Sequence, residues 1–277
     1  MKYVDIHCHL DSKDFDSDRE AVLARMKESG VGAITIGADL ESSKKAVEIA
    51  EQNENVWACI GVHPEEVSKG TFWDRGISKV PFDTSEFENL IKSPKVVGIG
   101  ECGLDYFTPR SSSEAKSEVG FLDKTKQKKL FESQIQFALK YDKPLMLHIR
   151  DAYTDALDIL ESYHKVYRGK LRGNSHFFAG GIEQAKRFLD LGFTMSFTGV
   201  VTFTHDYDKI IKYIPQNFIM SETDAPWVAP VPFRGKRNEP IYVIEVIKKM
   251  AEIRGEDFNV LNKAIIKNFE RVFLNRE

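Results

Sequence analysis

The sequence of 277 residues has no apolar stretch that approaches the roughly 20 residues of a membrane-spanning helix. Its first residues, Met1–His7, include lysine, aspartate and histidine, which interrupt the apolar core that a signal peptide needs. It also lacks an excess of positive charge, because 39 basic residues oppose 42 acidic ones and the net charge is −3. We therefore expect no membrane association and no extended basic surface that coats nucleic acid. A nucleic-acid substrate would be held locally, at an end or through a few nucleotides.

Cysteine is scarce, since the chain has only Cys8, Cys59 and Cys102, without paired spacing. An odd number of cysteines in strand-like segments favours small buried side chains over a disulfide framework. With 42% hydrophobic residues and no visible repeats or linkers, the chain is expected to form a single domain over residues 1–277. We expect a monomer without an obligate protein partner, in a reducing, cytoplasmic compartment.

Short apolar runs alternate with segments of helical periodicity from end to end. The predicted strands are Tyr3–His7, Ala33–Ile36, Val56–Ile60, Val96–Ile99, Leu145–His148, Ser175–Phe177, Thr194–Phe197 and Phe218–Ser221. The predicted helices include Ala21–Glu28, Ser43–Glu51, Phe121–Lys140, Ala152–His164, Ile182–Asp190 and Asp208–Tyr213. This α/β alternation, with eight strands in about 250 residues, is typical of a (β/α)8 TIM barrel. A doubly wound open sheet is the competing fold, but it would not bring together the ends of the first, fourth, fifth, sixth and eighth strands.

The most informative motif is Asp5-x-His7-x-His9, on the first predicted strand. Alternate residues of a strand point to the same face, so these three side chains lie together. Two imidazoles placed in this way can bind one metal ion from adjacent coordination positions. Two ordinary histidines at a strand–loop junction are the alternative interpretation. Asp5 lies deeper on the strand, and we expect it to orient His7 by a hydrogen bond.

Further candidate ligands stand at the ends of other predicted strands. Glu101 comes just past the fourth strand, between glycines that allow close approach of backbone and ligand. His148 ends the fifth strand, His176 lies on the sixth, and Asp224 follows the eighth. Taken singly, His148 could be a rim histidine and Asp224 a helix cap. In a barrel, however, these positions meet at the catalytic face, and with the two N-terminal histidines they exceed the needs of one ion. They predict two divalent cations that share a carboxylate.

Two residues near these strand ends are candidates for contact with a phosphate. His63, in Gly61-Val-His-Pro64, ends the third strand and is suited to phosphate contact or proton donation. Arg150 lies two residues past His148 on the same face, and its guanidinium suits a bidentate grip on phosphate. A surface salt bridge is the alternative for Arg150.

Weaker signals for nucleic acid come from charged and aromatic residues outside these motifs. The basic groups are Lys124, Lys126, Lys128 and Lys129 at the start of one helix, and Arg234, Lys236 and Arg237 past the eighth strand. The aromatic residues are Phe72, Trp73 and Phe107, on the long irregular segments Pro64–Thr84 and Asp105–Gly120. Solvated charged faces and aromatic side chains that pack the loops down are the alternative interpretations.

With these motifs in place, the sequence resembles the TatD family of metal-dependent deoxyribonucleases, within the amidohydrolase-like barrels. The resemblance runs nearly the full length and rests on Asp5–His9, Gly61–Pro64, Gly100–Asp105, Leu147–Arg150, His176–Gly181, Glu222–Pro226 and Arg237–Pro240. Many amidohydrolase-like barrels bridge their metals with a modified lysine on the fourth strand, where this chain has Glu101, and this difference favours the phosphate-cleaving branch. Phe177 and Ala179 stand where family members often have small or hydroxyl residues, so the pocket is expected to differ.

The resemblance implies two sets of metal ligands joined by a shared one: His7, His9 and Asp224 for the first ion, Glu101 as the bridge, and His148 with His176 for the second. It also implies that His63 contacts the scissile phosphate. Asp224 is then placed to take a proton from the attacking water or to pass one to the leaving oxygen. Histidine ligands favour zinc, manganese, cobalt or nickel over magnesium, whereas the resemblance implies magnesium or manganese.

The expected function is therefore phosphodiester hydrolysis by a deoxyribonuclease of the TatD type. We expect a 3'-5' exonuclease on single-stranded or frayed DNA ends, with a hydroxide held between two ions as nucleophile. A hydrolase of small esters, lactones or amides is the alternative enzyme, because the same metal site polarises a carbonyl group. A metal-binding interaction protein without turnover is the third class, although a structural metal site would be closed rather than open to a groove.

Overall fold

In the computed structural model, eight parallel strands form one sheet in which each strand pairs with the next along the chain. The structure describes residues 1–67, 82, 84–108, 124–167 and 169–276. The strands are β1 (Tyr3–Cys8), β2 (Val31–Ile36), β3 (Val56–Ile60), β4 (Val96–Asp105), β5 (Leu145–Arg150), β6 (Gly173–Ser175), β7 (Thr194–Phe197) and β8 (Ile219–Ser221). This sequential order confirms the predicted barrel and rules out the doubly wound sheet, whose strand order reverses.

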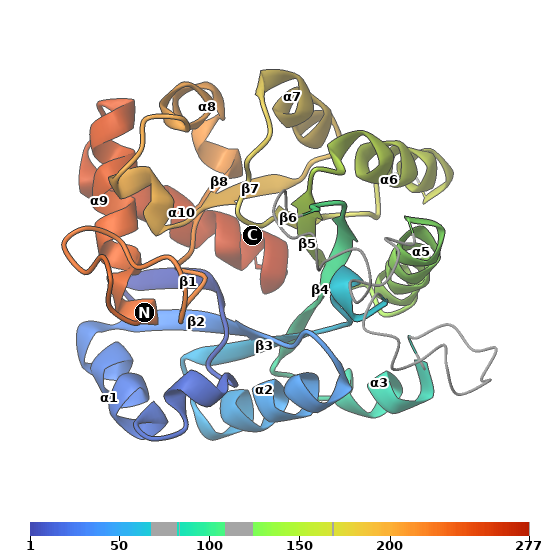
Figure 1. The fold of residues 1–277 in the computed structure, drawn as a ribbon, viewed down its shortest axis with the longest axis horizontal. Coiled ribbons are helices and arrows are strands. Elements are labelled where there is room, and N and C mark those ends of the chain that lie inside the picture. The colour runs from blue at the N-terminus through green and yellow to red at the C-terminus, as the bar shows by residue number, and fades with distance from the viewer. Residues whose placement is uncertain (68–81, 83, 109–123, 168, 277) are drawn as a thin grey trace, which may run out of the picture.

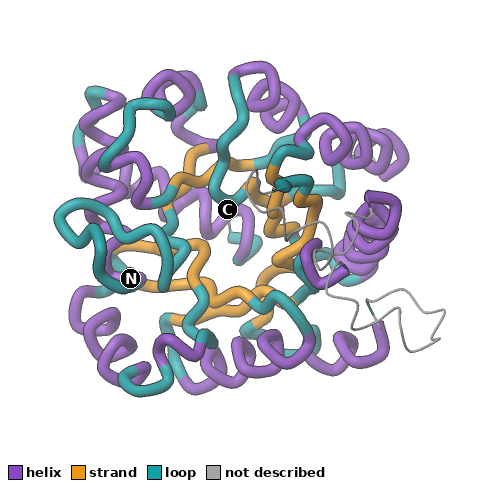
Figure 2. Tube along the Cα trace, viewed as in Figure 1, coloured by secondary structure: helices purple, strands orange, loops and turns teal. Residues whose placement is uncertain are grey.

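The helices surround the ring of strands, as Figures 1 and 2 show. They are α1 (Arg19–Ser29), α2 (Leu40–Gln52), α3 (Thr84–Leu90), α5 (Lys124–Lys140), α6 (Tyr153–Tyr167), α7 (Ile182–Asp190), α8 (Asp208–Tyr213), α9 (Val243–Arg254) and α10 (Phe258–Phe273). Within the described ranges, no helix combines the length and the apolar composition needed to cross a membrane.

The first strand and the segment after the last one meet through backbone hydrogen bonds. The amide of Asp224 donates to the carbonyl of His7 at 2.9 Å, and the amide of His9 donates to the carbonyl of Ala225 at 2.7 Å. These bonds hold the end of β1 against the segment past β8. Residues from the two ends of the chain are thereby placed side by side.

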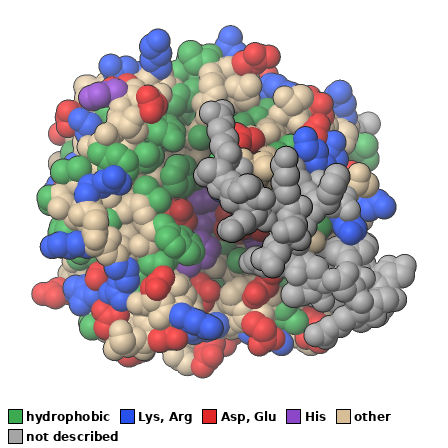
Figure 3. All heavy atoms as spheres, viewed as in Figure 1, with side chains coloured by type: hydrophobic (Ala, Val, Ile, Leu, Met, Phe, Trp, Pro, Cys, Tyr) green, Lys and Arg blue, Asp and Glu red, His purple; other side chains and the backbone are tan. Residues whose placement is uncertain are grey.

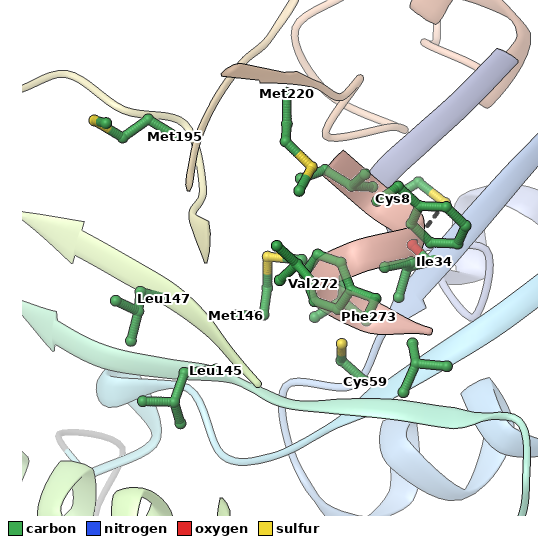
Figure 4. Packing of buried hydrophobic residues seen from close by; sticks show 14 of the residues in the cluster. Cys8, Ile34, Cys59, Leu145, Met146, Leu147, Met195, Met220, Val272 and Phe273 are labelled. Carbon is green, nitrogen blue, oxygen red and sulfur yellow. Dashed lines mark hydrogen bonds between the residues drawn. The ribbon is translucent and has the colours of Figure 1, made fainter. Parts of the chain in front are cut away.

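Helix α10 lies across the end of the barrel at which the strands begin. The buried amide of Asn268 donates to the carbonyl of Ile219 at the start of β8, and Asn262 donates to the carbonyl of Lys2 before β1. Figure 4 shows Phe273 of this helix close to the buried side chain of Met146. The helix therefore closes this end with apolar side chains and leaves the opposite end for polar residues.

The three cysteines are free and fully buried, as predicted. The thiol of Cys8 donates to the carbonyl of Ile34 at 3.4 Å, and Figure 4 shows Cys8 and Cys59 among the packed side chains of the core. Burial is the main cause that raises the pKa of all three thiols. They act as small apolar side chains here.

Several strand boundaries differ from the prediction, and three of them lie beside candidate ligands. Strand β5 continues to Arg150, so His148 lies within the strand and does not end it. Strand β4 continues to Asp105, so Glu101 lies within the strand and not just past it. The continuation depends on Gly103, whose φ is 143° and at which a Cβ would collide with the carbonyl oxygen of His148. Strand β6 ends at Ser175, so His176 follows the strand, and its amide donates to the carbonyl of Leu147 at 3.0 Å.

Helix ends follow the sequence signals in part. Gly30 ends α1 with a left-handed φ of 72°, as expected for a glycine just past a helix. Asp18 precedes α1 at the position of a cap, but its carboxylate makes no capping hydrogen bond. It accepts two hydrogen bonds from Arg237 instead, each 2.7 Å long.

Candidate metal centre

The six candidate ligands gather at the carboxyl ends of the strands, inside the mouth of the barrel. Figure 3 looks onto this face and shows histidine and acidic atoms at the bottom of a hollow. His7 is fully buried, and His9, Glu101 and His176 are each less than a tenth exposed. Burial of so many ionisable groups is costly unless they are paired or bind a metal.

The first group of ligand atoms comes from β1 and the residue that follows it, from β4 and from the segment after β8. Nε2 of His7 lies 3.3 Å from Nε2 of His9, 3.6 Å from Oε2 of Glu101 and 3.7 Å from Oδ1 of Asp224. Nε2 of His9 lies 3.8 Å and 3.7 Å from the same two oxygens. Four ligands about 2.1 Å from one ion in a tetrahedron lie about 3.4 Å apart. The spacing of these atoms therefore fits a cation at their centre.

The second group surrounds the other oxygen of Glu101. Oε1 lies 2.7 Å from Nδ1 of His148, 3.2 Å from Nε2 of His176 and 3.7 Å from Nε2 of His63. The two carboxylate oxygens of Glu101 thus face different sets of histidines. One carboxylate is shared between two places at which imidazole nitrogens converge.

His148 and His176 each have a carboxylate on the other ring nitrogen. Nε2 of His148 lies 2.9 Å from Oδ2 of Asp105, and Nδ1 of His176 lies 3.1 Å from Oε1 of Glu222. The fully buried Glu222 also accepts a hydrogen bond from Ser196 at 2.6 Å. Such outer carboxylates fix the tautomer and the orientation of a metal-binding imidazole.

Sequence reasoning gave no role to Asp105 or Glu222. Both lie inside motifs that carried the family resemblance, Gly100–Asp105 and Glu222–Pro226. The available signal was an acidic residue at a strand end beside a candidate ligand. Nothing local indicates which histidine each would contact.

Asp5 does not orient the His7 ring, in contrast to the prediction. Its carboxylate accepts from the backbone amide of His7 at 3.2 Å, from the amide of Thr223 at 2.9 Å and from the Thr223 hydroxyl. Burial raises the pKa of Asp5 well above its ordinary value, against these hydrogen bonds. Asp5 therefore joins β1 to the segment past β8, because it faces backbone donors and not the imidazole. Nδ1 of His7 is buried without a hydrogen-bond partner among the described residues.

The charges of the site balance one another. Burial alone would raise the pKa of Glu101, but the surrounding histidines, with His176 foremost, hold it well below the ordinary value. Burial disfavours a charged His148, yet its contacts with Asp105 and Glu101 raise its pKa to about 9. Burial likewise disfavours a charged His9, but its contact with Asp224 and the nearby carboxylates raises its pKa to about 9. Protons on imidazoles thus neutralise the carboxylates in the metal-free protein.

His63 lies beside this centre, with its ring centroid 4.2 Å from that of His148. Burial, reinforced by the neighbouring imidazole, lowers its pKa to about 3. Nδ1 accepts from the amide of Glu65 at 3.2 Å, so the proton of the neutral ring is on Nε2. That N–H is directed into the site, where Glu101 lies 3.7 Å away.

Arg150 borders the site from β5. Its guanidinium lies 3.5 Å above the ring of Phe107, and Nη1 is 3.9 Å from Asp105. The side chain is 46% exposed, so a ligand can reach it. A cavity of about 500 Å³ is lined by Arg150 together with His148, Ile149, Asp151, Tyr153, His176, Phe177, Ala179 and Asp224. Arg150 and three of the candidate ligands therefore face one space.

The weaker candidates are mostly engaged in other contacts. Lys128 pairs with Asp155 at 2.8 Å, and Lys124 lies over the ring of Tyr106. Arg237 pairs with Asp18, which leaves Arg234 as the more accessible arginine of its segment. Phe72 and Trp73 lie outside the described residues.

The fold agrees with comparisons to known proteins. The sequence model of a family described as "TatD related DNase" matches residues 4–274. The chain belongs to the TatD family. The resemblance seen in the sequence is thereby confirmed over almost the whole chain, and the family is one of metal-dependent hydrolases.

Curated relatives of this TatD-family chain differ in how far they are characterised. It is 33% identical over 272 residues to the "Uncharacterized metal-dependent hydrolase YabD" of Bacillus subtilis, which covers 97% of this chain and 98% of the relative. It is 31% identical over 279 residues to the "3'-5' ssDNA/RNA exonuclease TatD" of Pectobacterium parmentieri, with coverage of 97% and 98%. Both comparisons extend over nearly the full length of each protein.

Among solved structures, the chain is similar to YJJV, a TatD homologue from Escherichia coli, with a TM-score of 0.82 and 27% identity. That match covers 100% of this chain and 99% of the other. The barrel is also shared with an uncharacterised amidohydrolase from Saccharomyces cerevisiae, at a TM-score of 0.80 and 21% identity, over 99% and 100% of the two chains. At that identity the likeness concerns the fold alone.

Proposed function

We propose that this TatD-family protein is a phosphodiester hydrolase that removes nucleotides stepwise from the 3' ends of single-stranded or frayed DNA. The main observation behind the proposal is that the two carboxylate oxygens of Glu101 face two different groups of imidazoles. A shared carboxylate of this kind suits two divalent cations side by side. The polarity and the strand preference are supported by the relative from Pectobacterium parmentieri, whose name states them for that protein.

The donor set fits divalent cations, since neutral imidazole and carboxylate are their ordinary protein ligands. In this proposal His7, His9 and Asp224 would hold the first ion, and Glu101 would be a ligand that both ions share. His148 and His176 would hold the second ion. Bound cations would supply a nucleophile at neutral pH by lowering the pKa of water, and would neutralise charge on the phosphoryl oxygens.

Other residues of the chain would orient the metal ligands, donate a hydrogen bond to the substrate and accept a proton. Asp105 and Glu222 hold the rings of His148 and His176 in one orientation, so that the other nitrogen of each ring faces Glu101. His63 donates its Nε2 proton as a hydrogen bond to a phosphate oxygen, because the ring is neutral and Nδ1 is already occupied. Asp224 keeps a lowered pKa through its contact with His9 despite burial, so it is available to accept a proton.

Arg150 grips a phosphate next to the scissile one in this proposal. It stacks on Phe107, which restricts its guanidinium, and it faces the same cavity as Asp224 and His176. A guanidinium held in one orientation loses less freedom when it binds a phosphate. The site thus contacts few phosphates, as an enzyme that acts on a strand end requires.

A time course on end-labelled DNA tests the proposal. With added magnesium, manganese or zinc, a labelled single strand should give a ladder that shortens from its 3' end. A duplex should be cut more slowly, and a closed single-stranded circle should resist. Rapid cutting of the circle without a ladder would indicate an endonuclease. Inertness toward all three, with hydrolysis of a lactone, ester or amide, would instead support a small-molecule hydrolase.

A further inference from the structure

Trp227 is a large exposed aromatic side chain at the edge of the metal centre. The residue is 52% exposed, and its ring lies edge-to-face against His9 with centroids 5.0 Å apart. Exposed single aromatics are common on protein surfaces, but this one borders buried candidate ligands. A molecule whose phosphate reaches His9 would therefore lie close to the indole ring.

The backbone of Trp227 is held rigidly. Its amide donates to the carbonyl of Asp224 at 2.9 Å, and its carbonyl accepts from the fully buried Asn238 at 2.6 Å. Asn238 also donates to the carbonyl of Thr223 at 2.9 Å, so the same amide fixes the segment that carries Asp224. These hydrogen bonds therefore fix the backbone of Trp227 relative to the segment that carries Asp224.

Other exposed apolar side chains lie in the same segment and in the one packed against it. The amide of Val231, 47% exposed, donates to the hydroxyl of Thr202, which brings the segment after β8 against residues 199–203. Next to Thr202, Phe203 is 39% exposed, and the guanidinium of Arg234 lies 3.6 Å above its ring. Within the described part of the chain, Arg234 has no salt-bridge partner. We call Trp227, Val231, Phe203 and Arg234 the aromatic rim.

Resting on the function proposed above, we propose that the aromatic rim binds single-stranded nucleic acid, and that Trp227 stacks on the nucleobase next to the scissile phosphate. Aromatic faces that alternate with an arginine are the means by which proteins hold unpaired strands, because every base has a face that can stack. In a duplex those faces are covered by neighbouring bases. The available charge of Arg234 complements a phosphate further along the strand. Trp227 would therefore determine specificity for unpaired ends.

Paired oligonucleotides test this role. One is a single strand with ordinary bases, and the other has the same length and phosphates but abasic sugars at its last three or so positions. The wild-type protein should have a kcat/KM at least about tenfold higher on the strand with bases, given the usual contribution of a base stacked on an aromatic ring. Trp227→Ala should lose that preference and retain turnover of the abasic strand. Trp227→Phe should keep most of it.

Tyr167 provides a matched control, since it is 40% exposed at the end of α6, away from the strand ends that carry the site. Tyr167→Ala should behave as wild type. If Trp227→Ala keeps the preference, or the wild-type protein has none, the stacking role is wrong while the nuclease stands. Equal loss on both strands, with reduced bound metal, would mean that Trp227 acts through His9, which also overturns the proposal. A wild-type protein inert toward both strands would instead refute the nuclease function on which the proposal rests.

Discussion

Oδ2 of Asp105 lies 2.9 Å from Nε2 of His148, on the side of the ring opposite Glu101. The carboxylate holds the imidazole so that Nδ1 faces the centre of the site. Asp105→Asn keeps the shape but removes the charge, and we expect metal affinity to fall by about 10–100-fold. Titration of the metal-free variant with manganese measures this. Unchanged affinity in a folded variant would show that Asp105 has no part in holding the ring.

Glu101→Ala should abolish activity and reduce bound metal from about two ions towards one, because the shared ligand is lost. Glu101 contacts polar groups of the site and not the apolar core, so the fold should persist by circular dichroism. Elemental analysis measures the metal. Glu88→Ala, an exposed carboxylate on α3 that pairs with Lys140, serves as control. Two tightly held ions with wild-type turnover in Glu101→Ala would refute the binuclear arrangement.

Single alanine substitutions should separate the two ions. His7→Ala and His9→Ala should weaken the first ion, and His148→Ala and His176→Ala the second. Activity should be partly restored by higher metal concentrations, since one ligand of several is missing in each variant. His205→Ala provides the control, because that ring is 85% exposed. Equal metal affinity in all four variants and wild type would make the assignment of ligands wrong.

Arg150→Ala should weaken binding of single-stranded DNA by about 1–3 kcal/mol, as for a hydrogen bond to a charged group. With a net charge of −3 and few phosphate contacts, the dependence of affinity on salt should be shallow in the wild-type protein and shallower still in the variant. Fluorescence anisotropy over a salt series measures both quantities. Lys165→Ala removes an exposed charge from α6 and should change neither. A steep salt dependence would indicate a longer phosphate track.

Metal affinity should increase with pH from neutrality to about 9. Burial disfavours the charged rings of His9 and His148, but nearby carboxylates outweigh it and raise both pKa values to about 9 in the metal-free protein. Because the folded pKa values are raised, both rings hold protons below pH 9 and must release them to bind a cation. Calorimetry in buffers with different ionisation heats measures the released protons. Binding without proton release at pH 7 would contradict the prediction.

Much of this molecule could be predicted from local signals. Short apolar runs between helical patterns located all eight strands, because the period of side-chain burial depends on neighbours along the chain. Alternation on β1 placed His7 and His9 on one face, and the strand ends marked Glu101, His148 and Asp224 as neighbours once a barrel was assumed. The boundaries near Glu101 and His176 were missed, since they depend on hydrogen bonds to an adjacent strand.

The sequence by itself determined the succession of strands and helices along the chain and the residue types at the strand ends. Only the tertiary structure decided that the oxygens of Glu101 face different histidines, and that Asp105 and Glu222 support separate rings. It also placed Asp5 against Thr223 and not the His7 ring. These contacts join residues up to 218 positions apart, as between Asp5 and Thr223. The barrel fold sets them, because it brings together strand ends that are far apart in the sequence.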